Sequence, residues 1–493
     1  MNFFNVLRAN LFALCGICLI SSCDNTDILG DEDDISVLDG NQRVNKWIHS
    51  TMKSKYYWLD EIDSFNKYNI DATPDAFFSS LISSNEKKKV VSGDNEYIYY
   101  YSYIINNNKT KASNQKEYTY GIEFITYSIS NQNRYEARVM YVLPGSPAEK
   151  AGLKRGMWIG KINNSYINDI SILNSLYSGG ELVLEVEDYR NVYFGEAEAP
   201  EVKSLTVSGA IEMYNNPILK DTVFSLENEN VGYLAYNHFT TGPNSFENKQ
   251  FDDELVDVFR KFHASEVSKL IIDLRYNPGG YLDCCRHLAS LMARKEDSNE
   301  IFCKVTHNSA SGYSPSIYKI QDKSTSNVDI SGIKLNTTDL YFITGQYSAS
   351  ASEALINGFK AFDGINVISV GMTTEGKNLA SNNFRNDDLG WELQPITGKV
   401  SNKNDNSDYF NGLKPTYELD EFNTKEYGYY WGDFGTKDDG LINFVINKIT
   451  NTEEEPETKS SVKKLFKTDA IKKNSSIERR KFNTCILDPN FIQ

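Results

Sequence analysis

The sequence contains few of the residues that build metal sites and histidine-based catalytic triads. It has 5 histidines and 7 cysteines among 493 residues. None of the histidines lies next to a recognisable triad element, and the four cysteines after position 23 contain no CxxC spacing. Cys284 and Cys285 are adjacent on a predicted helix, so we expect them in the core rather than in a disulfide. The sequence therefore predicts no metal ion and no cofactor.

The chain also lacks a concentrated basic surface. Its 67 acidic residues exceed its 51 basic residues and give a formal charge of −16. Nucleic-acid binding requires clustered lysine and arginine, because neutralised phosphates supply most of the affinity. We therefore exclude nucleic acid as a partner. Only 12 prolines and a 40% hydrophobic content are typical of a globular chain, and 493 residues exceed the size of one ordinary core. Two or three folded units are expected.

The first 22 residues are typical of a secretory signal. Arg8 precedes an apolar run over residues 11–20, which is too short to span a bilayer, and two serines then precede Cys23. The sequence ISSC resembles the bacterial lipoprotein box, which implies acylation of Cys23 and a mature chain that begins there. An ordinary signal peptide with an incidental cysteine is the alternative. On the lipoprotein interpretation, the acidic residues 23–40 form a tether to a membrane of the bacterial cell envelope, either outer-membrane and periplasm-facing or at the cell surface.

Hydrophobic periodicity divides the remaining chain into three units and a tail. Helical spacing over residues 41–89 predicts a small helical N-terminal unit, and short β-rich runs broken by glycine, asparagine and serine follow over residues 90–205. Strands and helices alternate over residues 206–450, which predicts a largely parallel sheet covered on both faces. Residues 451–493 have weak periodicity and are predicted to be a flexible tail, with local docking through Phe482 and Ile486 as an option. The predicted fold class is therefore mixed, multi-domain α/β.

The hexapeptide SASASE, residues 348–353, is the sharpest candidate for catalytic chemistry. It follows a predicted strand and begins a predicted helix. A nucleophile at such a turn has an exposed hydroxyl oxygen, and the backbone N–H groups at the positive end of the helix can stabilise an oxyanion. A helix cap formed by Ser350 or Ser352 is the alternative interpretation.

Two further segments follow predicted strands and contain paired or framing glycines. The octapeptide GMTTEGKN, residues 371–378, places Lys377 beyond the carboxyl end of a strand, where open α/β sheets bind ligands. A lysine base requires burial that lowers its pKa toward neutrality, and a solvated loop lysine is the alternative. The octapeptide DLRYNPGG, residues 273–280, has two glycines that allow backbone N–H groups to turn toward a ligand.

In this order, the three segments resemble the C-terminal processing, or tail-specific, serine peptidases over about residues 41–450. The resemblance implies an α/β core of the ClpP and crotonase type, with Ser350 as nucleophile and Lys377 as general base. The implied reaction is acyl-enzyme hydrolysis of a peptide bond. The implied oxyanion hole consists of backbone N–H groups from Ala351 and from Gly279 or Gly280.

The β-rich unit resembles a PDZ domain. Residues 143–153, LPGSPAEKAGL, and the pentapeptide YGIEF carry the resemblance. It implies that a turn and a strand edge bind the C-terminal carboxylate of a protein or peptide substrate. A PDZ-like fold that only braces the core is the alternative. The implied carboxylate-binding residues are Tyr120, Gly121, Ile122, Glu123 and Phe124.

The sequence departs from the family pattern near the predicted base. Many members have a glutamine four residues after the lysine, whereas this chain has Ser381, whose hydroxyl could orient Lys377. An inactive scaffold that binds peptide C-termini is the alternative function, although the presence of both Ser350 and Lys377 favours an enzyme. If peptide binding gates catalysis, Ser350 and Lys377 are expected to lie apart in the free chain.

Overall fold

A computed structural model describes most of the chain. The predicted signal, Cys23 and most of the predicted tether lie outside the described residues. Within the described part, no helix combines the length and apolar character needed to cross a membrane. The described residues are 38–92, 95–106, 117–129, 132–243, 246–422, 430–452 and 470–477.

The predicted helical N-terminal unit is present. It contains α2 (Gly40–Lys55) and α3 (Pro74–Leu81), which pack together and bury their apolar residues in one cluster. Asp39 caps α2 by accepting the Gln42 N–H, and the Gln42 side chain accepts the Asp39 N–H in return. Pro74 occupies the first turn of α3, where its missing N–H has no intrahelical partner to lose.

Three short strands follow this unit and differ from the prediction. The β-rich unit was expected to begin at residue 90, but β1 (Lys88–Ser92) pairs with β2 (Asn95–Tyr99) alone. The next strand, β3 (Tyr103–Asn106), joins β20 (Phe384–Asn386) and β21 (Trp391–Gln394). The physical reason is packing, because apolar residues of β3 and β21 lie against the cluster beneath α2 and α3.

The predicted β-rich unit, termed the β-rich module below, is an antiparallel sheet with the strand order β10-β9-β7-β6-β5-β24. Its interior is formed by alternating residues such as Val139, Ile159 and Leu184, and the 3-10 helix η5 (Ile170–Tyr177) contributes Leu173 and Leu176. The main strands are β5 (Ile122–Ile129), β6 (Arg134–Val142), β7 (Trp158–Ile162), β9 (Leu182–Asp188) and β10 (Glu201–Val207). Smaller elements are β4 (Glu117–Thr119) paired with β11 (Ile211–Met213), β8 (Ser165–Tyr166), α4 (Pro147–Lys150) and α5 (Arg190–Tyr193).

The edge of this sheet is formed by a segment from near the end of the chain. Strand β24 (Ala470–Ser475) pairs antiparallel with β5. The prediction of a flexible tail over residues 451–493 is therefore wrong for this segment. Backbone pairing explains the error, because a strand that adds to a sheet edge through N–H and C=O groups needs little side-chain periodicity.

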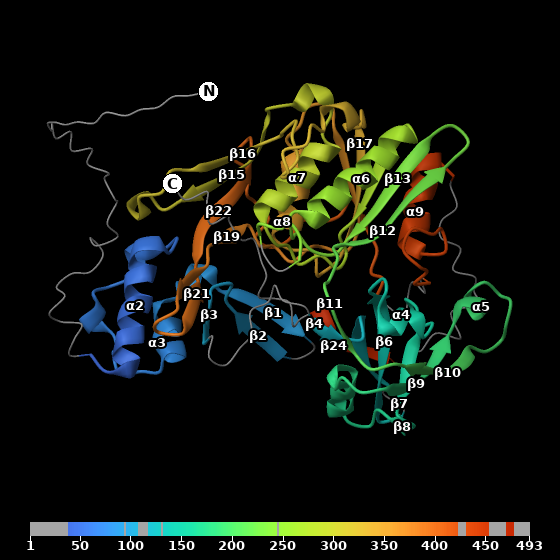
Figure 1. Cartoon of the computed structure of the whole chain (residues 1–493), viewed down its shortest axis with the longest axis horizontal. Coiled ribbons are helices and arrows are strands. Elements are labelled where there is room, and N and C mark those ends of the chain that lie inside the picture. Colours follow the sequence, from blue (N-terminus) through green and yellow to red (C-terminus); the bar gives the residue numbers. More distant parts are fainter. Residues whose placement is uncertain are drawn as a thin grey trace, which may run out of the picture.

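The unit over residues 206–450, termed the core below, has the predicted α/β organisation. Its sheet has the order β12-β13-β14-β17-β18-β23, parallel except for the antiparallel pair β12 and β13. Figure 1 shows α6, α7 and α8 on one side of these strands and α9 on the other. The strands are β12 (Ile218–Ser225), β13 (Asn230–Tyr236), β14 (Val267–Asp273), β17 (Asp339–Thr344), β18 (Asn366–Gly371) and β23 (Tyr417–Glu418). The helices are α6 (Gln250–Ala264), α7 (Leu282–Met292), α8 (Ala351–Phe359) and α9 (Gly440–Thr450).

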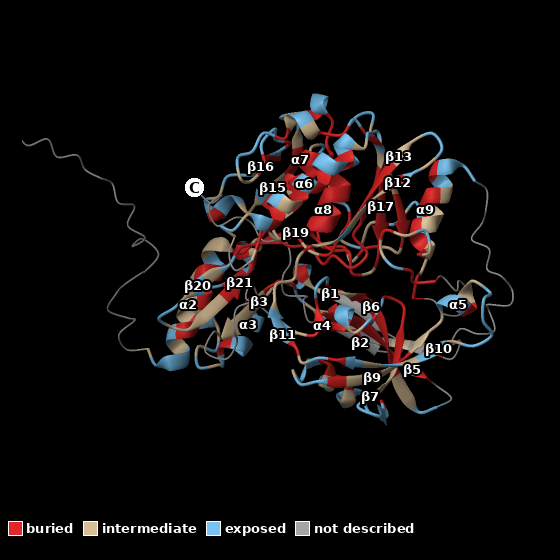
Figure 2. Cartoon of the chain, turned by 45° about the vertical axis from the view of Figure 1, so that its right-hand side comes forward, coloured by how far each residue is buried: buried red, intermediate tan, exposed pale blue. Residues whose placement is uncertain are grey.

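Alternating residues of the core strands explain why both faces are covered. Ile272 packs with the cluster of α6, α7 and α8, whereas the neighbouring Ile271 packs with the cluster of α9. Buried residues accordingly fill β13, β17 and α8 in Figure 2. The predicted buried positions of Cys284 and Cys285 in α7 are confirmed, and neither forms a disulfide within the described part of the chain.

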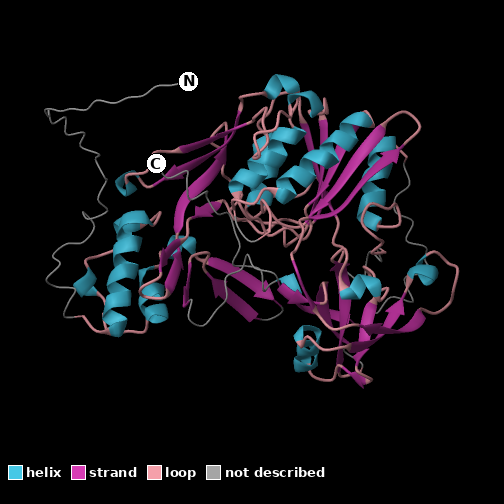
Figure 3. Ribbon diagram, in the orientation of Figure 1, coloured by secondary structure: helices cyan, strands magenta, loops and turns pink. Residues whose placement is uncertain are grey.

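A separate sheet connects the core to the N-terminal unit. Figure 3 shows this sheet beside the helices of that unit. Its order is β16-β15-β22-β19. The Tyr57 N–H donates to the Ile396 carbonyl at 2.8 Å, so β22 is bound directly to the N-terminal unit. The strands are β15 (Ile301–His307), β16 (Ser316–Lys319), β19 (Leu379–Ser381) and β22 (Ile396–Asn402).

Candidate active site

Ser350 lies at the turn between β17 and α8. Its φ of +60° and ψ of −109° are rare for a residue with a side chain, and strain of this kind is typical of a strand-to-helix nucleophile turn. The side chain is buried, and its Oγ has no hydrogen-bond partner among the described residues. Ser352 Oγ instead donates to the Asn277 carbonyl at 2.9 Å. Ser350 is thus the N-cap residue of α8 by position, but its side chain makes no capping hydrogen bond among the described residues.

Glu353 connects the turn of Ser350 to the loop of Lys377. Its fully buried carboxylate accepts the N–H groups of Ser350, Gly376 and Lys377, each at 2.7 Å, and the hydroxyl of Thr374. Burial raises the pKa of Glu353 to about 7, while these donors oppose the shift. Glu353 stands at the third position of a helix, which is a local signal for a capping glutamate, but no sequence motif predicts its contact with the Lys377 loop.

Lys377 is also buried, with an exposed fraction of 1%. Its Nζ lies 4.8 Å from the centroid of the Tyr101 ring. Burial raises the pKa of Glu86, and the charge of Lys377 is among the effects that oppose this rise. The structure thus places the lysine inside the protein, near an aromatic ring and a buried carboxyl group from the N-terminal unit, and excludes a solvated loop lysine.

The predicted catalytic pair occupies two loops at the carboxyl ends of neighbouring strands. Ser350 follows β17, and Lys377 follows β18, which is the parallel neighbour of β17. Because Ser350 Oγ has no hydrogen-bond partner among the described residues, it makes no hydrogen bond to Lys377 Nζ. Glu353 nevertheless binds the backbone of both residues, so their loops are held together.

The glycine pair of the third predicted segment lies against Ser350. A Cβ atom on Gly279 would come within 2.9 Å of Ser350 Cβ and 3.2 Å of the Ala351 nitrogen. The Gly279 N–H, however, donates to Asn277 Oδ1 at 2.9 Å. Gly280 is therefore the better candidate for the second oxyanion donor. Ala351 begins α8, where the first N–H groups have no intrahelical acceptor.

Ser381 is buried in β19, where it is bound by a side chain from β21. Its Oγ accepts a hydrogen bond from Gln394 Nε2 at 2.7 Å, and Gln394 Oε1 accepts one from the Tyr103 hydroxyl. An amide side chain thus lies beside Ser381 although no glutamine occupies that position in the sequence. Sequence reasoning missed Gln394 and Tyr103 because they come from strands whose pairing has no local motif.

Comparisons with known proteins identify the family. The model named Peptidase family S41 matches residues 230–419, and the model named Peptidase S41 N-terminal domain matches residues 43–103. The chain belongs to peptidase family S41. A crystal structure described as an S41 protease from Bacteroides fragilis is 25% identical with a TM-score of 0.69, and the match covers 83% of this chain and 98% of that chain.

A second structure, the photosystem II D1 C-terminal processing protease, is 16% identical with a TM-score of 0.44, and the match covers 78% of this chain and 95% of that chain. No curated protein sequence matches this chain. S41 membership supports a serine-type peptidase that acts on protein substrates.

The predicted carboxylate-binding residues of this S41 chain lie at the start of β5. Gly121 has a φ of +78°, and a Cβ atom there would lie 2.3 Å from Ser146 Cβ, so the turn requires glycine. Tyr120, Ile122 and Phe124 pack into the core of the β-rich module. Glu123 and the Phe124 N–H instead contact Ser476, just after β24.

A buried ionic network joins the β-rich module to the S41 core. Arg155 of the module donates to Glu421 at 2.9 Å, to Asp439 at 3.2 Å and to the Tyr276 hydroxyl at 2.6 Å. Arg275 of the core binds the same two carboxylates. Burial raises the pKa of Asp439, but the two arginines outweigh it and hold that pKa below its usual value.

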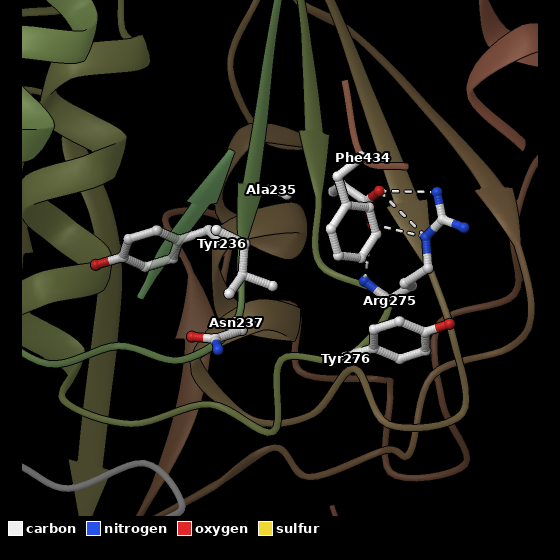
Figure 4. Close-up of a pocket in the computed structure, with 8 residues that line it drawn as sticks. Ala235, Tyr236, Asn237, Arg275, Tyr276 and Phe434 are labelled. Atoms are coloured by element: carbon white, nitrogen blue, oxygen red, sulfur yellow. Dashed lines mark hydrogen bonds and ion pairs between the residues drawn. The ribbon is translucent and has the colours of Figure 1, made fainter. Parts of the chain in front are cut away.

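Figure 4 shows Arg275, Tyr276 and Phe434 around a small pocket where β13 and β14 end. Tyr276 immediately precedes Asn277, whose amide oxygen binds the Gly279 N–H. The network therefore places an arginine of the β-rich module next to the segment that carries the glycine turn. No local sequence pattern marked Arg155 or Asp439 as members of a shared network.

Proposed function

We propose that this S41 protein is a serine endopeptidase in which Ser350 is the nucleophile and Lys377 is the general base. The observation that carries the proposal is the position of Glu353, which accepts N–H groups from both residues and so fixes a strained serine beside a buried lysine. The Ser350 hydroxyl adds support, because it has no hydrogen-bond partner in the described part of the chain and such buried hydroxyls are uncommon outside functional sites.

The proposed reaction proceeds through an acyl-enzyme. Ser350 Oγ attacks the scissile carbonyl carbon while the neutral amine of Lys377 accepts the hydroxyl proton, and the N–H groups of Ala351 and Gly280 stabilise the oxyanion. Lys377 then donates that proton to the leaving amine. A water molecule, deprotonated by Lys377, hydrolyses the ester and regenerates Ser350. This sequence requires Ser350 Oγ and Lys377 Nζ to come within hydrogen-bond distance when substrate binds.

Substrate selection is assigned to the β-rich module acting as a PDZ domain. In this proposal an extended substrate tail pairs with the edge of β5, and its terminal carboxylate lies at the turn of Tyr120 and Gly121. The strand and the turn are adjacent in the chain, as this mode of recognition requires. Proteins or peptides with free C-termini are the proposed substrates.

The proposed location is the bacterial cell envelope, with Cys23 acylated. Metabolic labelling of cells with an alkyne-tagged fatty acid should mark the wild-type chain and leave Cys23→Ala unmarked. Labelling of both chains would contradict acylation at Cys23.

A hydrolysis assay tests the catalytic assignment. Wild-type protein should cleave an internally quenched peptide, whereas Ser350→Ala and Lys377→Ala should each lose at least about 1,000-fold in rate. Both variants should retain the wild-type melting temperature within a few degrees. Unchanged hydrolysis in either folded variant would contradict the assignment. Peptide binding without hydrolysis by the wild-type protein would favour the inactive scaffold instead.

A further inference from the structure

Residues 470–477, termed here the tail segment, occupy the free edge of the sheet in the β-rich module. The register pairs Ala470 with Ile129, Lys472 with Tyr127 and Ser475 with Ile125. The tail segment therefore runs antiparallel to β5 and advances toward the beginning of that strand. This is the direction in which a bound peptide would carry its C-terminal end toward the turn before β5.

The tail segment uses the polar groups that a peptide ligand would need. Ser476 Oγ accepts the Phe124 N–H at 2.8 Å, and its hydroxyl donates to the Glu123 carboxylate. Glu123 and Ser476 are both buried. The Phe124 N–H and the Glu123 carboxylate are thus bound by a side chain that lies 352 positions later in the sequence than Phe124.

The same segment also contacts the loop that carries the nucleophile. Lys472 Nζ donates to Gln346 Oε1 and lies 4.7 Å from the centroid of the Phe422 ring. Gln346 lies between β17 and Ser350. Ala470 and Ile477 are buried in a cluster that includes Tyr347 and Phe422 of the core. The tail segment, which occupies the β5 edge, is therefore in direct contact with the loop that carries Ser350.

The contacts also define what else would fit the same edge. A competing strand needs a basic residue that reaches Gln346 and Phe422, followed four positions later by a hydroxyl residue that reaches Phe124 and Glu123. A competing strand would form the same kind of backbone hydrogen bonds with β5 that the tail segment forms. Exchange of one strand for the other therefore loses few hydrogen bonds.

We propose that the tail segment is an intrachain ligand of the β5 edge and that it competes with extended peptides of this chemistry. Binding competition is independent of catalysis. Only its effect on hydrolysis rests on the proposed peptidase function. In this view the chain closes its own peptide edge until a substrate tail displaces residues 470–477.

A binding experiment on the full chain tests the competition. Fluorescein-labelled AIKKNSSI, the sequence of residues 470–477, is titrated against Ser350→Ala protein and followed by anisotropy. Adding Lys472→Ala and Ser476→Ala should tighten peptide binding at least about tenfold, because the intrachain competitor loses its polar contacts. The matched control carries Lys319→Ala and Ser316→Ala on the edge strand β16 and should bind as weakly as the parent. Equal affinity in all three proteins would overturn the proposal.

A locked variant keeps the test decisive if the open variant is unstable. Ile125 and Ser475 are direct cross-strand partners, so Ile125→Cys with Ser475→Cys can form a disulfide. The oxidised protein should not bind the labelled peptide, and reduction should restore binding. Binding that is identical before and after reduction would overturn the proposal.

Hydrolysis separates this inference from the proposed function. With Ser350 intact, the Lys472→Ala and Ser476→Ala variant should have a several-fold lower KM for a peptide ending in this chemistry, with kcat unchanged. Tighter peptide binding without any hydrolysis would retain the competition and contradict the peptidase assignment. Hydrolysis with wild-type KM in the open variant would retain the peptidase and contradict the competition.

Discussion

The catalytic loops and the β5 edge are built in contrasting ways. Ser350 and Lys377 are 27 positions apart, and backbone bonds to one buried carboxylate fix both loops. The β5 edge is completed by a segment more than 300 positions away, through strand pairing and a few polar contacts. This difference teaches that the proposed reacting groups belong to a fixed frame, whereas in our proposal the strand on the β5 edge can be exchanged. Changes in the frame should therefore have large effects, and changes near the edge should be graded.

The largest effect is expected from breaking the buried ionic network that joins the β-rich module to the S41 core. Arg155→Met leaves Glu421 and Asp439 with Arg275 as their remaining arginine partner. Loss of one member of a buried ionic network should cost about 3–5 kcal/mol of unfolding free energy, measured by urea denaturation. Arg190→Met removes the exposed pair with Asp438 and should cost below about 1 kcal/mol. Similar losses in both variants would show that the junction is not specially stabilising.

The next effect tests the fixed frame itself. Glu353→Gln replaces one acceptor oxygen with an amide that faces backbone N–H donors. The misplaced loops should lower kcat by about 100-fold, with a smaller change in KM. Exposed Glu296→Gln is the control and should retain wild-type kinetics. Wild-type kcat in a folded Glu353→Gln protein would remove Glu353 from the account.

A second buried carboxylate, Asp252, should make the stability of the folded protein depend on pH. Burial raises the pKa of Asp252 from 3.8 to about 7, and its Oδ1 has no hydrogen-bond partner among the described residues. Between pH 3.8 and about pH 7, the folded state therefore binds more protons at Asp252 than the unfolded state does. The stabilisation that comes from the protonated Asp252 is lost as the pH rises toward 7. Relative to Asp252→Asn, the wild type should lose about 2 kcal/mol between pH 5 and pH 8 in urea unfolding. Parallel stability curves for the two proteins would contradict this.

The smallest expected effect concerns the surroundings of the base. Glu86 lies close enough to Lys377 for their charges to interact. Glu86→Gln removes a group that favours a protonated lysine, so the acid limb of the kcat/KM profile should move to lower pH by about 1 unit. Glu61→Gln, an exposed change in the same unit, is the control. An unmoved acid limb in Glu86→Gln would exclude an electrostatic role for Glu86.

Local signals account for what the sequence could predict. Helical spacing and Pro74 predicted the N-terminal unit, and alternating strands and helices predicted the α/β core. Cys284 and Cys285 also lie in a segment with a helical pattern, whereas the serine turn was marked by the resemblance of three ordered segments to the C-terminal processing peptidases. In each case the residues that decide the structure are neighbours in the chain.

Long-range pairing explains what the sequence could not predict. Strand β3 joins β21 rather than the β-rich module, and β24 joins β5, because backbone hydrogen bonds carry no side-chain signature. Gln394 reaches Ser381 only after β19 and β21 are in place. Arg155 likewise finds its carboxylates only when the module docks on the core.

Active-site labelling tests the central claim most directly. Wild-type protein is treated with a fluorophosphonate, and the rate and position of modification are measured by intact-protein and peptide mass spectrometry. A single adduct on Ser350 is predicted, with no adduct in Ser350→Ala and labelling slowed by at least about 100-fold in folded Lys377→Ala. Modification of a different serine, or an equal rate in Lys377→Ala, would contradict a Ser350 nucleophile activated by Lys377.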